Sequence, residues 1–158
     1  MRRSVALAFA FAAIAAPLAA QSSHPDFSGK WTLDPKSVDS PMAPTSATMT
    51  VAQDAKVLKI DQSVSTQMGD QKATLAFNLD GSPSKNNVAA QGMSIDLAST
   101  AAWEGPALVV KTTADIQGQT MVSTERWTLD ADGKTLRMQR DASVAGQSMS
   151  MKMVFNKQ

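Results

Sequence analysis

Residues 121–144 read MVSTERWTLDADGKTLRMQRDASV, and apolar and polar side chains alternate along them with few exceptions. A period of two is typical of a β-strand with one buried face, because successive side chains point to opposite sides. The turn signal Asp130-Ala131-Asp132-Gly133 divides the stretch into two strands of a hairpin. The same alternation and short turns run through the last sixty residues, which predicts an antiparallel meander without crossover helices.

The chain before this region shows the same organisation. An alternating strand is predicted at 27–33, and others follow a proline-containing loop at 34–45, in which the prolines exclude a long helix. Residues 82–92, rich in Ser, Asn and Gly, show no clear pattern. We count eight or nine strands in one all-β domain. An open sheet of this size exposes two edges, so we predict closure into a barrel, with a two-sheet sandwich as the alternative.

The first twenty residues have the pattern of a signal peptide. Arg2 and Arg3 precede an uncharged apolar run, so we expect cleavage after Ala20 and export to the periplasm or the medium. Cleavage leaves 138 of the 158 residues and lowers the formal net charge from +1 to −1. The mature chain is then a flexible leader at 21–26 and one domain at 27–158, with no apolar stretch of membrane-spanning length.

The composition argues against several classes of function. A near-neutral chain lacks the basic face that nucleic acid requires. The sequence has no cysteine and one histidine, His24, so we expect no thiol chemistry, no histidine metal cluster and no Ser-His-Asp triad. Acid–base catalysis requires two carboxyl groups on one inner face, and we place only Glu125 there. We therefore predict a monomeric, non-enzymatic protein without a metal or other cofactor.

The first predicted strand, Phe27-Ser28-Gly29-Lys30-Trp31, carries a G-x-W motif. This motif at the start of a meander resembles the calycin superfamily, which comprises lipocalins and fatty-acid-binding proteins. The resemblance implies a calycin-like barrel in which Gly29 precedes a structural plug, Trp31, that an arginine from the end of the barrel commonly covers. The final strand of this chain has no arginine. The chain also resembles small exported bacterial proteins of unassigned function.

Hairpin register places two charged residues on the apolar face. If Leu129 lies opposite Leu136, Glu125 lies directly opposite Arg140. A charge on that face is costly unless it is paired. One interpretation is a polar spot inside a cavity, where Arg140 can bind a ligand carboxylate or phosphate. The other is a structural pair at a wet end of the barrel.

Large apolar side chains supply the remaining candidates for the lining of a pocket. Core packing is the default interpretation of each of them, and pocket lining is the second: Trp103, Trp127, Met138 and Met151. The alternating methionines at 149–153 could also bind Cu(I), because thioethers are soft ligands.

The leading functional hypothesis is binding of a small apolar or anionic amphipathic molecule inside the barrel. A structural or interaction module with a filled core is the alternative, and Cu(I) handling is the third. The interior distinguishes them, because a solvent-connected opening of about 300 Å³ or more supports binding and a filled interior supports the structural module.

Overall fold

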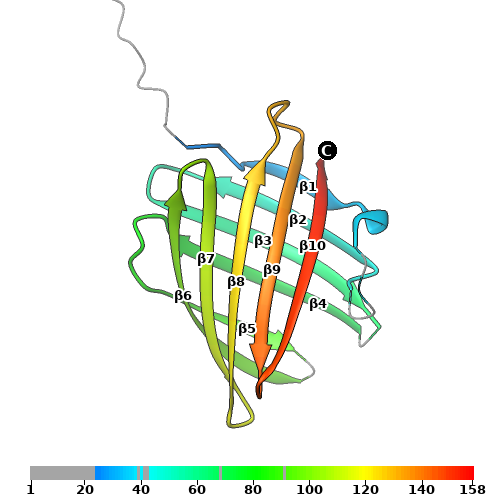
Figure 1. Ribbon diagram of the computed structural model, residues 1–158, viewed down its shortest axis with the longest axis vertical. Helices are drawn as coiled ribbons and strands as arrows, with labels where there is room; N and C mark the ends of the chain where they lie inside the picture. The colour runs from blue at the N-terminus through cyan, green and yellow to red at the C-terminus, as the bar shows by residue number, and fades with distance from the viewer. Residues whose placement is uncertain (1–23, 39, 41–42, 68, 91) are drawn as a thin grey trace, which may run out of the picture.

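The computed structural model describes residues 24–38, 40, 43–67, 69–90 and 92–158, so the expected signal peptide and its cleavage site lie outside the described residues. The described chain is almost entirely β-structure (Figure 1). Its ten strands are, in chain order, β1 (Gly29–Leu33), β2 (Ser46–Gln53), β3 (Val57–Thr66), β4 (Gly69–Asn78), β5 (Ser84–Ala90), β6 (Met93–Glu104), β7 (Ala107–Ile116), β8 (Gln119–Leu129), β9 (Thr135–Val144) and β10 (Gln147–Lys157).

One short helical turn interrupts this β-structure among the described residues. It is a 3-10 turn at Pro35–Ser37, in the connection between β1 and β2. Ser37 ties this connection to β10, because the Val154 N–H donates to its Oγ at 2.9 Å. In the described part of the chain, no helix has the length and apolar character needed to cross a membrane.

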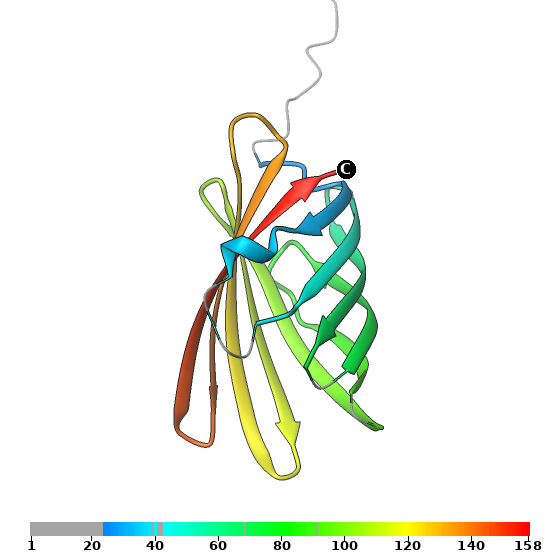
Figure 2. The same ribbon diagram turned by 90° about the vertical axis from the view of Figure 1, so that its right-hand side faces the viewer.

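The ten strands form one antiparallel sheet in the order β4-β3-β2-β1-β10-β9-β8-β7-β6-β5. Strands β6 to β10 cross in front of β1 to β4 in Figure 1, and Figure 2 shows the two halves facing each other. Pairing of β1 with β10 joins the two halves into a continuous sheet. The all-β meander closed into a barrel is therefore confirmed, and the two-sheet sandwich is not observed.

The tenth strand, β5, lies in the segment where the sequence shows no clear alternation. The inward positions of β5 begin with Ser84 and Asn86, so the apolar signal of a strand is weak there. These polar side chains close the barrel against β4. The Ala76 N–H donates to Asn86 Oδ1 at 2.7 Å, Asn86 Nδ2 donates to the Ala76 carbonyl at 3.0 Å, and the Asn78 N–H donates to Ser84 Oγ at 2.8 Å. The side-chain amide of Asn86 thus makes the two hydrogen bonds to β4 that the backbone of a paired strand would otherwise make.

Replacing Asn86 with alanine should lower the free energy of unfolding by about 1–2 kcal/mol, because the backbone N–H and the carbonyl of half-buried Ala76 both lose their hydrogen-bond partner. Urea unfolding measures the loss. Asn87→Ala is the matched control. Asn87 lies next to Asn86 on β5 but on the outer face, where its exposed side chain donates to Asp96 of β6. Equal urea midpoints for the two variants would show that the Asn86 bonds do not hold the barrel closed.

One end of the barrel is filled by a hydrophobic core, and Trp31 is at its centre. Trp31 is 1% exposed, and its Nε1 donates to the Phe27 carbonyl at 2.9 Å. Strand pairing sets Lys157 opposite Trp31, with Nζ 5.2 Å from the ring centroid. A lysine of the last strand therefore covers Trp31 where the resemblance implied an arginine, and a cation–π contact of this kind needs only a cation.

Gly29 makes this arrangement possible. Its φ of +137° lies in a region that other residues avoid, and a Cβ at this position would approach Lys157 Cε to 2.6 Å. Because the glycine of the G-x-W motif has no side chain, the aliphatic part of Lys157 fits beside Trp31, whose ring it covers.

Residues 24 and 25, which belong to the leader expected at 21–26, pack on the closed end. The His24 ring stacks on Trp103 with centroids 4.4 Å apart, and Gln53 Nε2 donates to the Pro25 carbonyl at 2.9 Å. The ring centroid of Phe27 lies 5.8 Å from the ring centroids of both Trp103 and Trp127. The start of the described chain thus covers the aromatic side chains of Trp103 and Trp127 at the closed end of the barrel.

Candidate functional site

Strand pairing aligns the inward side chains of β6 to β10 in rows across the sheet. A row close to the closed end contains Trp103, Leu108, Trp127, Met138 and Met153. The next row, which we call the charged row, contains Ala101, Val110, Glu125, Arg140 and Met151. The following row, which we call the hydroxyl row, contains Ser99, Thr112, Ser123, Ala142 and Met149. The predicted register of Glu125 opposite Arg140 is confirmed.

Glu125 and Arg140 form a closely bonded ion pair on the inner face. Arg140 Nε donates to Glu125 Oε1 at 2.7 Å, and Arg140 Nη2 donates to the same oxygen. Trp127 Nε1 donates to the second oxygen, Oε2, at 3.1 Å. Both carboxylate oxygens of Glu125 therefore have a donor. The Glu125 side chain is 16% exposed, whereas the Arg140 side chain is 42% exposed although it faces inward, so solvent reaches the arginine from within the barrel.

The structure brings some of the predicted pocket residues together and separates others. Trp127 touches Glu125 and is buried, and Met151 is half-buried opposite Arg140. Met138 is buried in the closed core. Trp103 lies at the closed end under His24, because its strand position is next to the β6–β7 turn. Trp103 and Met138 therefore pack the core and do not line an opening.

The opposite end of the barrel, which we call the mouth, is less completely buried than the closed end. The ends of β3, β5, β7 and β9 and the starts of β4, β6, β8 and β10 lie there, and the β7–β8 and β9–β10 turns lie together at the lower end of Figure 1. Ala114 is buried here, but the larger inward apolar side chains near this end are only half-buried, although they continue the same strand faces as the closed core: Val64, Val88, Ile95, Leu97, Ile116, Met121 and Val144. Met149 is 44% exposed. Leu97 was not singled out from the sequence, and Met121 was considered only with the methionines that could bind Cu(I), although both are in phase with Glu125.

The methionines extend along β10 from the core to the mouth. Met153 lies opposite Met138 and both are buried, whereas Met149 is exposed at the mouth. Successive inward positions of a strand are about 7 Å apart. Among the described residues, no three His, Asp or Glu side chains gather as metal ligands. Cu(I) binding by these methionines stays a prediction.

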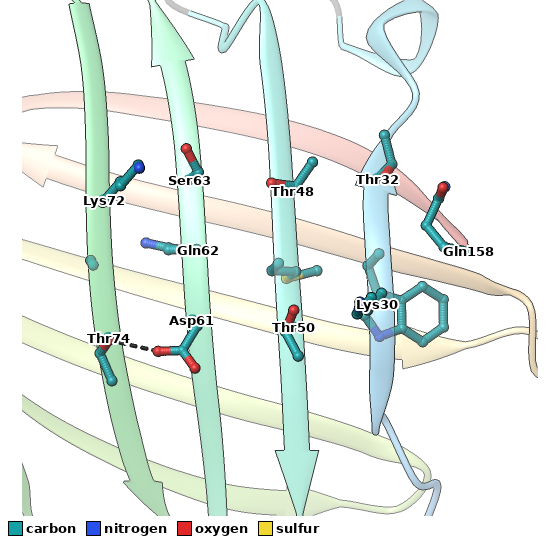
Figure 3. A pocket seen from close by; sticks show the side chains of 13 residues that line it. Lys30, Thr32, Thr48, Thr50, Asp61, Gln62, Ser63, Lys72, Thr74 and Gln158 are labelled. Atoms are coloured by element: carbon teal, nitrogen blue, oxygen red, sulfur yellow. Dashed lines mark hydrogen bonds between the residues drawn. The ribbon is translucent and has the colours of Figure 1, made fainter.

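The described surface also has two hollows on the outside of the barrel. The larger, of about 660 Å³, lies over β1 to β4. Figure 3 shows its outward side chains in two cross-strand rows, in which Thr74 donates to Asp61 at 2.6 Å and the others are Lys30, Thr32, Thr48, Thr50, Ser63 and Lys72. The smaller, of about 390 Å³, lies over β8 to β10. Both are shallow features of a solvated sheet face, and the sequence signals them only as the polar phase of each strand.

Comparison with known proteins establishes the fold and not a family. No family model matches the chain, and no curated protein matches its sequence. The fold is similar to that of the crystal structure of secretory abundant heat soluble protein 4 from Ramazzottius varieornatus, with a TM-score of 0.53 and 14% sequence identity over 87% of this chain and 99% of the other. At this identity the similarity supports the antiparallel β-barrel fold and says nothing about a ligand.

Proposed function

We propose that this protein binds a small apolar or amphipathic molecule in the mouth of the barrel, on the open side of the charged row. The supporting observation is the contrast between the two ends of the same strands. Most inward side chains at the closed end are buried, whereas most inward apolar side chains at the mouth and the inward Arg140 remain partly accessible to solvent. An accessible apolar surface enclosed by a barrel favours an apolar guest, because binding removes both surfaces from water.

The dimensions of the mouth fit a small ligand. Val144, at the end of β9, is four positions after Arg140, so the two residues are about 13 Å apart along the strand. An apolar tail would contact side chains such as Leu97, Met121 and Met149, and methionine adapts its shape to irregular guests. The polar part of an amphipathic ligand would then lie at the charged and hydroxyl rows.

The proposed role is binding without catalysis, in an exported protein. The signal-peptide pattern of residues 1–20 supports export. A structural module is the alternative function, and the filled closed half of the barrel supports it. The two proposals differ in one observable, since only the first requires a saturable site in the mouth.

Binding of the uncharged fluorophore N-phenyl-1-naphthylamine tests the proposal. The wild-type protein should give a saturable rise in fluorescence, and Leu97→Lys should weaken binding at least about tenfold, because the lysine places a charge in the apolar mouth. Ala98→Lys is the matched control, since the neighbouring residue is exposed on the outer face. Absence of saturable binding to the wild type, or equal weakening by the two variants, would favour the structural module.

A further inference from the structure

We infer that the mouth selects amphiphiles with an uncharged polar head over anionic amphiphiles that carry the same tail. This inference rests on the proposed function, and it replaces the anionic head that the sequence suggested. Its basis is the charge balance of the charged row, the free donors near it, and the distribution of charge around the mouth.

The charged row is already neutral and internally bonded. Glu125 accepts from Arg140 through one carboxylate oxygen and from Trp127 through the other. An anionic head at Arg140 would either displace Glu125 or leave the site with one uncompensated negative charge. Glu125 is largely buried, so both outcomes are costly in this environment.

The groups that remain available suit an uncharged head. Arg140 Nη1 donates to none of the described residues, so it can donate to a hydroxyl, ester or amide oxygen while Glu125 keeps its own bonds. On the mouth side lies the hydroxyl row, where Ser99 and Ser123 are buried and the half-buried Thr112 hydroxyl, 2.8 Å from that of Ser99, is the accessible one. Hydroxyls both donate and accept, which matches the hydroxyl groups of an uncharged head.

The surroundings of the mouth do not attract anions. The four turns at 66–69, 90–93, 116–119 and 144–147 contain no Asp, Glu, Lys or Arg. Apart from Glu125, which Arg140 already neutralises, the first charged residues on the two sides of each turn are mostly acidic: Asp61 and Asp70, Lys85 and Asp96, Asp115, and Asp141 and Lys152. An anion approaching this end therefore meets little positive potential, whereas an uncharged amphiphile is unaffected.

Competition of two ten-carbon amphiphiles with N-phenyl-1-naphthylamine tests the inference. Uncharged 1-decanoylglycerol should bind the wild-type protein at least about tenfold more tightly than anionic decyl sulfate. Glu125→Gln should shift this ratio about tenfold toward decyl sulfate, because Arg140 then lacks its carboxylate partner. Glu104→Gln is the matched control, since Glu104 pairs with Arg126 on the exposed outer face, and it should leave the ratio unchanged.

The outcomes separate the two levels of the proposal. If neither amphiphile displaces the fluorophore and the fluorophore itself does not bind, the proposed function is wrong. If both bind and decyl sulfate binds as tightly as 1-decanoylglycerol or more tightly, the proposed function stands and the preference for an uncharged head is overturned. The wild-type ratio alone decides this, so the test does not depend on the folding of Glu125→Gln. An unchanged ratio in a folded Glu125→Gln protein would also overturn it.

Discussion

Replacement of Trp31 with alanine should lower the free energy of unfolding by about 3–5 kcal/mol, the range typical of a fully buried tryptophan. Trp31 is 1% exposed at the closed end, and the variant would leave a cavity between β1 and the core. It would also remove the donor to the Phe27 carbonyl and the ring beneath Lys157. Three contributions, namely packing, a buried hydrogen bond and a cation–π contact, are lost together, which is why we expect one of the largest effects in the chain.

Urea unfolding followed by circular dichroism measures this loss. Trp31→Phe is the milder variant, because it keeps an aromatic body and removes only part of the volume and the N–H group, so its loss should be smaller. Trp103→Ala is a second comparison, since Trp103 is only half-buried and should cost less than Trp31→Ala. An unchanged midpoint for Trp31→Ala would mean that Trp31 does not plug the barrel and that the calycin resemblance misleads.

Replacement of Arg140 with leucine should lower the free energy of unfolding by about 2–3 kcal/mol, less than for a fully buried pair because solvent reaches Arg140. The loss arises mainly from Glu125, which is largely buried and would lose its cation. Glu125→Gln in the Arg140→Leu background should therefore recover about half of the loss, because the stranded charge is removed. Urea midpoints of the four proteins in this double-mutant cycle give the coupling between the two side chains.

Arg137→Leu is the matched control for this cycle. Arg137 lies on the same strand and faces outward, where its Nε and Nη2 donate to the two Asp130 oxygens at 2.8 and 2.7 Å. Hydrogen bonding from Arg137 lowers the pKa of Asp130. The pair is exposed to water, so its removal should leave the urea midpoint close to that of the wild type. If Arg140→Leu were equally harmless, the inward ion pair would contribute nothing to stability.

The ion pair could be predicted from sequence because its two residues belong to one hairpin. A short turn and a period of two determine which residues of neighbouring strands are opposed, so Glu125 opposite Arg140 follows from local information. The same information predicts eight or nine strands, and the described chain has ten. It fails at β5, where Ser84 and Asn86 face inward because their side chains bond the backbone of β4 across the closure.

The contacts that close the barrel could not be predicted, because they join segments far apart in the chain. Lys157 reaches Trp31 only through the pairing of the first strand with the last. The packing of His24 on Trp103 likewise depends on where the strand ends meet in space. For Trp103, core packing was the first interpretation and pocket lining the second, since alternation assigns a residue to a face but not to an end of the barrel.

Neighbouring residues and their alternation are enough to predict the all-β class, the antiparallel hairpins and the presence of two charges on an inner face. Which end of the barrel is filled, and which is less buried, depends on contacts between distant strands. Leu108 and Leu97 have the same apolar phase, yet Leu108 is buried at the closed end and Leu97 is half-exposed at the mouth. The burial of each leucine depends on how close the opposite half of the sheet lies to that end of the strand. This distance is a property of the closed barrel and not of any local stretch of sequence.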